Sequence, residues 1–402
     1  MFENLRKDNK ILFLIAGLGL IIRVFYVLTL TPDTIVFPDS FQYEEIAKNL
    51  LKGEGFSIGT GSYPYQHNRA PVYPAFIAFI YLFFGTDVVW IKIAQSLLNV
   101  LTILPIYGLG MMIFDRRVAL TASFIMAIDP FFIFFTGLIL SEILFMAFLS
   151  SSLFFLYVGV KNNKYLFLSI GSFMMGAAIL TRASLLIFPL FIAVWIMLEK
   201  RDDIKRALSS CFLFVIIVFF TLLPWVIRNY SVYHALVPVT IGGGVTLYES
   251  NNPLADGGPG YDRLPDLDTS LSPLERDNSY KAMAIRFISE NPGKFIRLVV
   301  AKLKRFWNII PNHEEYRSVK HILISLLSYV PILVFGIIGI ILSLTRDKKV
   351  LFLLLPVIYY TGLHTIFLGS VRYRVPIMPL FMIISAYGFL RAVYFIPFKR
   401  NG

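Results

Sequence analysis

The 402-residue sequence has little charge and almost no cysteine. Only 15% of its residues are charged and 57% are hydrophobic, which is more apolar than a soluble globular domain needs to fill its core. The single cysteine, Cys211, lies in an apolar run, which excludes an intrachain disulfide and a cysteine-rich metal site. The sequence also lacks a glycine-rich phosphate loop and a visible repeat of about 20–50 residues. These absences argue against a secreted disulfide scaffold, a nucleotide-dependent enzyme and a repeat protein.

Apolar runs of about 20 residues recur along the chain, and each is long enough for a membrane-spanning helix. Backbone groups in lipid must be bonded internally, so helices are the expected form. The fold class predicted is an all-α polytopic membrane protein with about ten or eleven transmembrane helices, outer-face loops and interfacial helices. The run 71–84 is short and carries Pro71 and Pro74, so we predict a partial or re-entrant helix there. The predicted crossings are 11–30, 88–113, 118–135, 138–160, 165–181, 183–198, 207–227, 321–344, 350–368 and 375–396.

The net charge of +12 comes from Lys and Arg residues at span ends and in short loops. Membrane topology explains this distribution better than nucleic acid binding does. The basic N-terminus predicts a cytoplasmic start, and 11–30 is predicted to be a retained first span rather than a signal peptide. Three parts follow: an N-terminal transmembrane module 1–227 with the first outer loop 31–70, an outer loop 228–318 with interfacial helices, and C-terminal helices 319–402. Within 228–318, the basic segment 294–307 is predicted to be an interfacial helix.

The stretch 31–74 is polar and turn-rich between two apolar runs. Residues 41–51 alternate apolar and polar side chains at helical spacing, which predicts a short amphipathic helix on the membrane surface. Asp39 follows Pro38 just before this helix, so it either caps the helix, faces a functional site, or does both.

Ionisable residues are expensive near a membrane, so their depth is informative. With this topology, several of them fall at the outer ends of their spans, on the same side as Asp39 and Arg69. Each also has an ordinary interpretation: the carboxylates can be hydrogen-bond partners between spans, and the arginines can be interfacial anchors. No metal-ligand spacing links the histidines. The residues on this side are Asp129, Glu142, Arg182, Arg228, Asn251, Asn252, His364, Arg372 and Arg374.

Arginines at the lipid boundary suit a phosphate whose ester tail stays in the bilayer, because a guanidinium binds phosphate oxygens bidentately. A carboxylate opposite them can accept a proton from an attacking hydroxyl as general base. A phosphate leaving group stabilised by fixed positive charge needs no nucleotide.

Short motifs in a consistent order resemble the GT-C fold membrane glycosyltransferases. The similarity is strongest to family 39, the protein mannosyltransferases and the aminoarabinose transferase of lipid A, and it extends over nearly the whole chain. The motifs are Pro38-Asp39-Ser40, Gly53-Glu54-Gly55-Phe56, Arg69-Ala70-Pro71 with Tyr73-Pro74, Asp129-Pro130, Ser141-Glu142, Leu180-Thr181-Arg182, Pro224-Trp225 with Arg228, Tyr248 with Asn251-Asn252-Pro253, and Arg372-Tyr373-Arg374.

The resemblance implies transfer of a sugar from a polyprenyl-phosphate donor to an acceptor hydroxyl, with inversion at the anomeric carbon. It implies that Asp39 is the general base, and we add Glu142 as a second catalytic candidate. The chain has one Asp39 followed by Ser where the protein mannosyltransferases carry an Asp-Glu pair, and it has no added luminal β-domain. The predicted donor-phosphate residues are Arg69, Arg182, Arg372 and Arg374. The predicted substrate-binding residues are Tyr43, His67, Tyr73, Arg228, Tyr248, Asn251, Asn252 and His364.

We predict no cofactor, and a divalent metal is the less favoured alternative because one carboxylate with scattered partners makes a weak metal site. The expected partners are the bilayer, the lipid-linked donor, and a lipid, glycan or protein acceptor, without nucleic acid. The predicted location is a prokaryotic plasma membrane, with the site on the extracytoplasmic side. Two other functions stay open: a secondary transporter, which requires inverted repeats and midplane polar groups, and a non-catalytic polyprenyl-lipid-binding protein, which requires the arginines but not Asp39.

Overall fold

The computed structural model describes residues 2–30, 37–58, 65–66, 69–260, 263–268, 270–312, 317–345 and 348–394. Most of these residues are helical, and β1 (Ser57–Ile58) and β2 (Tyr65–Gln66) form a two-stranded antiparallel ribbon. The helices of the first half are α1 (Phe2–Thr29), α2 (Pro38–Lys52), α3 (Val72–Phe84), α4 (Val88–Leu101), α5 (Ile103–Ile113), α6 (Arg116–Ile128), α7 (Pro130–Thr136), α8 (Glu142–Lys161), α9 (Tyr165–Thr181), η1 (Ala183–Leu185) and α10 (Phe188–Glu199). Those of the second half are α11 (Ile204–Tyr233), α12 (Gly243–Ser250), α13 (Pro273–Glu290), α14 (Pro292–Phe306), α15 (Val319–Leu344), α16 (Val350–Ile366), α17 (Val371–Arg374), η4 (Val375–Ile377) and α18 (Met378–Tyr394).

The predicted fold class, an all-α polytopic membrane protein, is confirmed. Among the described residues, six helical segments are long and apolar enough to cross a membrane, or seven if the bent pair α6 and α7 is one span. Shorter apolar helices occupy the remaining predicted crossings, at 165–181, 183–199 and 350–366. The predicted partial helix is α3, whose 13 residues reach only about 20 Å, less than the hydrocarbon core.

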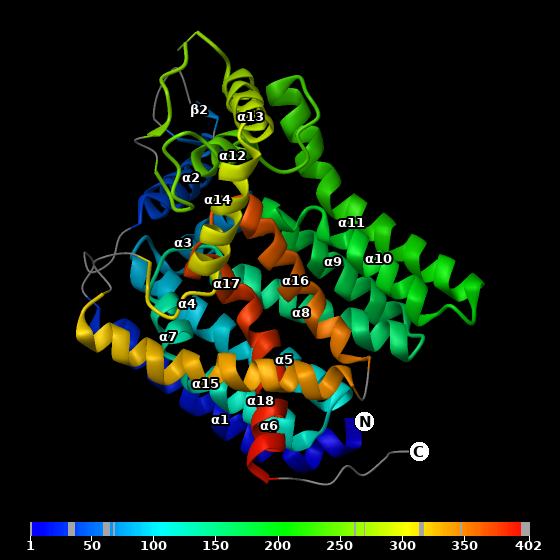
Figure 1. Cartoon of the computed structure of the whole chain (residues 1–402). Coiled ribbons are helices and arrows are strands. Elements are labelled where there is room, and N and C mark those ends of the chain that lie inside the picture. Colours follow the sequence, from blue (N-terminus) through cyan, green and yellow to red (C-terminus); the bar gives the residue numbers. More distant parts are fainter. Residues whose placement is uncertain are drawn as a thin grey trace.

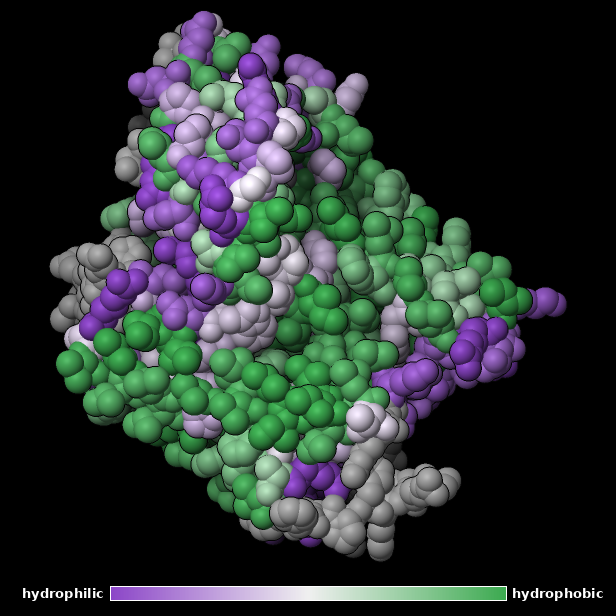
Figure 2. All heavy atoms as spheres, in the orientation of Figure 1, coloured by the Kyte–Doolittle hydropathy of each residue, from purple (hydrophilic) through white to green (hydrophobic). Residues whose placement is uncertain are grey.

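The polar and apolar surfaces separate cleanly. In Figure 1, α2, α12 and α13 lie together at the upper end, above the helices that pack around α8 and α9. Figure 2 shows hydrophobic residues covering α15 and the side of α11, whereas hydrophilic residues gather over α13 and at the helix ends on the right. This is the pattern of an apolar belt between two polar surfaces, as a polytopic membrane protein requires.

Glycines allow α15 and α18 to pack closely. A Cβ atom on Gly388 would lie 2.0 Å from the carbonyl oxygen of Phe335, and one on Gly339 would lie 2.2 Å from that of Ile384. Small residues at such positions let two membrane helices approach at backbone distance. The contact fixes α18, and therefore the turn α17 that precedes it and carries two of the predicted arginines.

The predicted interfacial helix 294–307 corresponds to α14 (Pro292–Phe306). This helix exposes Ile296 and Val300, as an interfacial helix does, but the Lys302 side chain is fully buried. The Lys302 ammonium donates to Asn251 Oδ1 at 2.7 Å and to the Ile366 carbonyl oxygen at 2.8 Å. Burial lowers the pKa of Lys302 to about 7, because the charged ammonium loses its hydration. Lys302 therefore ties α14 and the end of α12 to the end of α16.

Candidate active site

Asp39 does not cap its helix. The N-cap of α2 is Phe37, whose side chain makes no capping hydrogen bond, and the helix begins at Pro38. Proline at the first helical position has no N–H to leave unsatisfied, so the helix starts without a polar cap. Asp39 lies in the first turn instead, with its carboxylate directed at arginines from other parts of the chain.

The carboxylate of Asp39 pairs with Arg69, thirty residues further along the chain. Arg69 NH2 lies 2.6 Å from Asp39 Oδ1, and Arg69 Nε donates to Gln42 Oε1 at 2.8 Å. Asp39 and Gln42 lie three residues apart on one face of α2, so they can hold one guanidinium together. The sequence reasoning missed Gln42, although this spacing was visible in the sequence.

Arg372 joins this pair to the C-terminal part of the chain. Its NH1 lies 3.0 Å from Asp39 Oδ2, and its Nε donates to Glu142 Oε1. Ser370 caps α17 by accepting a hydrogen bond from the Arg372 backbone N–H, so the turn is fixed just before the arginine. One guanidinium thus bridges two carboxylates that come from α2 and α8.

Glu142 also pairs with Arg182, which follows α9. Arg182 NH1 lies 2.7 Å from Glu142 Oε1 and 3.2 Å from Ser141 Oγ. The Glu142 side chain is fully buried. Its second oxygen, Oε2, has no hydrogen-bond partner among the residues that the structure describes.

These five side chains form one charge ladder, in the order Arg69, Asp39, Arg372, Glu142 and Arg182. Three positive and two negative groups leave a formal excess of one positive charge. The side chains other than Glu142 are 16–28% exposed, so they lie in a partly desolvated place where charge interactions are stronger than in water. The ladder can therefore attract an anion, and it holds two carboxylates next to that anion.

The arginines set the proton affinity of Asp39. Burial alone raises the pKa of its carboxyl, but the positive charges of Arg372 and then Arg69 outweigh burial, so the pKa lies below its ordinary value. Asp39 is consequently ionised at neutral pH in this structure, and each of its oxygens faces a different guanidinium.

Two of the predicted substrate-binding residues, Tyr43 and Tyr73, pack together beside Arg69. The Arg69 guanidinium lies over the Tyr43 ring, 5.4 Å from its centre, which is a cation–π distance. Tyr43 packs edge-on against Tyr73 at 4.8 Å. Tyr73 is fully buried and donates to Gln95 Oε1 at 2.8 Å, so Tyr43 lies nearer to the ladder than Tyr73 does.

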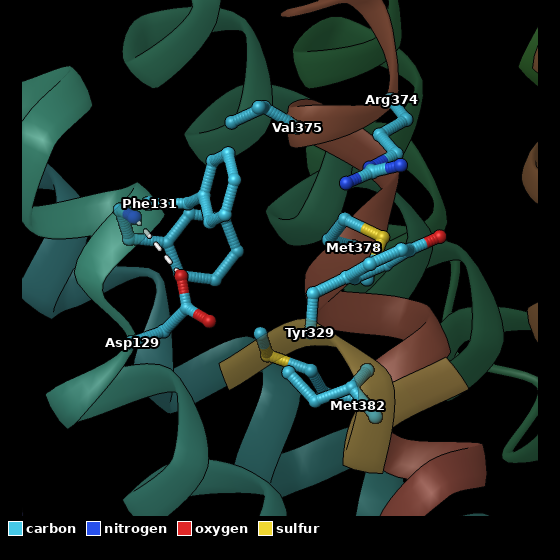
Figure 3. A pocket seen from close by; sticks show the side chains of 9 residues that line it. Asp129, Phe131, Tyr329, Arg374, Val375, Met378 and Met382 are labelled. Atoms are coloured by element: carbon cyan, nitrogen blue, oxygen red, sulfur yellow. Dashed lines mark hydrogen bonds between the residues drawn. The ribbon is translucent and has the colours of Figure 1, made fainter. Parts of the chain in front are cut away.

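Arg374, a predicted donor-phosphate residue, lies away from the ladder. It donates to the carbonyl oxygens of Phe306 and Asn308, at 3.1 and 2.6 Å, and its guanidinium lies 3.7 Å from the centre of the Tyr329 ring. In Figure 3, Arg374 and Asp129 lie on opposite sides of a small pocket with apolar walls. Asp129 caps α7 by accepting the backbone N–H of Phe132 at 3.1 Å, the dashed line in Figure 3.

Asn251 and Asn252 have structural contacts rather than an open position at the site. Both are buried. Asn251 Nδ2 donates to the Leu247 and Ile366 carbonyl oxygens, and Asn252 Nδ2 donates to that of Tyr248. Asn251 holds the end of α12 against the end of α16, whereas Asn252 bonds back to α12 itself.

The other predicted substrate residues lie apart from the ladder, with one exception. Arg228 lies over the rings of Trp225 and Phe56, which attaches the end of α11 to the segment that follows α2. Tyr248 packs near the Tyr280 ring at 5.8 Å, and His67 lies outside the described residues. His364 is the exception, because it stacks on Tyr373, the neighbour of Arg372.

Among the described residues, no group of three or more His, Cys, Asp or Glu side chains is placed to hold a metal ion. That the reaction needs no metal ion stays a prediction. It rests on the arginines, which can supply the positive charge instead.

The fold is the GT-C fold of membrane glycosyltransferases. The chain is similar to the oligosaccharyltransferase AglB of Archaeoglobus fulgidus, in complex with an inhibitory peptide and a dolichol-phosphate, with a TM-score of 0.62 at 16% identity over 99% of this chain and 53% of that one. It is also similar to ArnT of Cupriavidus metallidurans bound to undecaprenyl phosphate, with a TM-score of 0.60 at 15% identity over 94% of this chain and 60% of that one. The chain spans 53–60% of the length of these two structures.

Within this class, residues 68–227 match the protein family described as dolichyl-phosphate-mannose-protein mannosyltransferase. The matched segment holds Arg69, Glu142 and Arg182, and the other two ladder residues lie outside it on either side. No curated protein matches the sequence. The resemblance predicted from the short motifs is confirmed at the level of the fold.

Proposed function

We propose that this protein transfers a sugar from a polyprenyl-phosphate-linked donor to an acceptor hydroxyl at the outer face of the membrane. The observation that carries the proposal is the charge ladder, in which arginines from three parts of the chain converge on two carboxylates. The AglB and ArnT structures, which hold a dolichol-phosphate and undecaprenyl phosphate, support a lipid phosphate as the ligand of the same fold here.

The arginines bind the donor phosphate. A guanidinium donates two parallel hydrogen bonds to phosphate oxygens, and Arg372 and Arg182 share Glu142, which keeps the two groups together. Fixed positive charge stabilises a phosphate that develops additional negative charge as the bond to the sugar breaks. Glu142 acts as a positioning residue in this arrangement, because both of its arginine contacts use the same oxygen.

Asp39 is the general base, and donor binding makes it available. In the structure both oxygens of Asp39 pair with arginines, so the carboxylate is a poor proton acceptor. The donor phosphate competes for Arg372 and Arg69 and draws at least one of them from Asp39. The acceptor oxygen then attacks the anomeric carbon, the bond from that carbon to the phosphate oxygen breaks, and Asp39 takes the hydroxyl proton. The products are an inverted glycoside and the polyprenyl phosphate.

Two functions of other classes compete with this proposal. A secondary transporter requires polar groups at the bilayer midplane between repeats, whereas the ladder joins α2 and residues at helix ends. A non-catalytic lipid-binding protein requires the arginines alone, and it gives no reason for a carboxylate held between two of them.

Reconstitution tests the proposal directly. The purified full chain is placed in liposomes with undecaprenyl phosphate carrying radiolabelled mannose, glucose, galactose or a pentose, together with lipid, glycan or peptide acceptors. We expect transfer to an acceptor, or slow donor hydrolysis without one, to depend on Asp39 and Arg372. Equal turnover by wild type, Asp39→Asn and Arg372→Ala would refute the site assignment.

The pH dependence of the reaction should differ between the free and the donor-bound protein. Arginines lower the pKa of Asp39 in the free protein, and phosphate binding weakens these pairs, so the pKa rises on binding. Since the base must be ionised, activity falls as pH falls through that pKa. We therefore expect kcat to decline at a higher pH than kcat/KM does. If kcat and kcat/KM declined at the same acidic pH, this result would contradict the proposed competition between phosphate and Asp39 for the arginines.

A further inference from the structure

His364 lies in a stack of rings that leads away from the charge ladder. Its imidazole is parallel to the Tyr373 ring at 4.6 Å and to the Phe306 ring at 5.5 Å. The Arg182 guanidinium lies over Tyr373, 5.6 Å from the ring centre. His364 is thus two contacts from the end of the ladder, with two aromatic rings stacked on its imidazole.

The tautomer of His364 is fixed by one hydrogen bond. Nδ1 lies 2.8 Å from the Leu368 carbonyl oxygen. A carbonyl oxygen only accepts, so Nδ1 carries the hydrogen. The ring is buried among aromatic side chains, and burial disfavours a charged imidazole. Nε2 is then an acceptor with a lone pair.

This acceptor is buried without a partner. His364 is 6% exposed, and its Nε2 has no hydrogen-bond partner among the residues that the structure describes. An unsatisfied buried acceptor costs about 1–3 kcal/mol, and buried polar groups in native proteins are nearly always paired. A ligand group that donates a hydrogen bond would satisfy this acceptor.

The chemistry of Nε2 selects the kind of donor. A phosphate oxygen accepts hydrogen bonds when ionised and cannot pair with a lone pair, whereas a sugar hydroxyl donates. The sugar is one bond away from the phosphate that Arg182 is proposed to bind. We propose that His364 Nε2 accepts a hydrogen bond from one hydroxyl of the donor sugar, which makes His364 a specificity-determining residue. This inference rests on the proposed function and extends it to recognition of the sugar.

Two substitutions at His364 separate recognition from packing. In His364→Asn the side-chain amide takes the place of Nδ1 and keeps a donor to Leu368, but nothing replaces Nε2. In His364→Gln the amide oxygen reaches the place of Nε2 and keeps an acceptor. The matched control is His234→Asn, which changes an exposed histidine that ends α11 in the left-handed conformation, where asparagine is accepted.

The dissociation constants of the undecaprenyl-phosphate hexose that wild type binds best, and of its monodeoxy analogues, give the readout. We expect one analogue to bind wild type and His234→Asn about tenfold more weakly than the parent donor. The same analogue and the parent should bind His364→Asn equally, and His364→Gln should recover part of the discrimination. Because each comparison is between two ligands on one variant, a general loss of stability does not imitate the result.

If wild type and His364→Asn discriminated equally among the analogues, His364 would have no role in sugar recognition. The proposed function would remain intact. Equal binding of all analogues by wild type would exclude that role as well, since Nε2 would then be satisfied by water. If neither the hexose donors nor the pentose donor of the reconstitution test binds wild type, both the proposed function and this inference fail.

Discussion

Replacing Asp39 by asparagine is expected to lower the rate of sugar transfer about 100- to 10,000-fold, the usual contribution of a general base, without weakening donor binding. The amide is nearly the same size as the carboxylate but accepts no proton at neutral pH. It also releases Arg69 and Arg372, which pair with the carboxylate in the structure. The affinity for undecaprenyl phosphate should therefore stay the same or rise by up to about tenfold. Turnover and titration of the lipid by the purified variant measure the two effects.

The opposite directions of these effects make the test specific. A variant that merely folds less well loses binding and turnover together. Glu44→Gln is the matched control, because Glu44 lies on the same helix and pairs with Lys48 and Tyr81 outside the ladder. We expect this variant to retain transfer and donor affinity. Loss of undecaprenyl phosphate binding in Asp39→Asn would show that the carboxylate supports the binding site rather than the chemistry.

The part of the site that lies close together in the sequence was predictable. Asp39 and Arg69 belong to one polar stretch between apolar runs, and topology places that stretch on one side of the membrane. Glu142, Arg182 and Arg372 were assigned to the same side from their positions at span ends. The side of the membrane does not, however, tell which of these residues are in contact. The pairing of Arg372 with both carboxylates depends on how α2, α8 and α17 pack.

Arg374 and Lys302 lie elsewhere than the sequence suggests, for one physical reason. Arg372 and Arg374 are two residues apart in one helical turn, which rotates their side chains by about 200° around the axis. They therefore point to nearly opposite sides, although the sequence shows one basic motif. Lys302 is a similar case: its neighbours along α14 make it look interfacial, but it faces Asn251 and the end of α16. Sequence indicates which residues are costly to bury, and tertiary packing decides which of them are buried.

Because Arg372 belongs to the charge ladder and Arg374 does not, the two arginines are expected to differ in their effect on lipid binding. Arg372→Gln should weaken binding of undecaprenyl phosphate about 10- to 100-fold, because a charge-assisted hydrogen bond contributes about 1.5–3 kcal/mol. Its carboxylate neighbours keep other partners, since Arg69 still pairs with Asp39 and Arg182 with Glu142. The variant is therefore expected to fold. Titration of the lipid with the purified protein gives the loss of affinity.

Arg374→Gln provides the contrast, at the same substitution and two residues away. It removes the donor to the Phe306 and Asn308 carbonyl oxygens and the contact with Tyr329, all within a buried part of the chain. Unsatisfied buried carbonyls cost about 1–3 kcal/mol each, so thermal stability should fall while the folded protein binds the lipid with unchanged affinity. Arg374→Gln could instead reduce lipid affinity as strongly as Arg372→Gln. The phosphate would then have to bind next to Arg374, at the pocket that Arg374 and Asp129 line. The charge ladder would then be a structural ion-pair network, and Asp39 would lose its place opposite the leaving group.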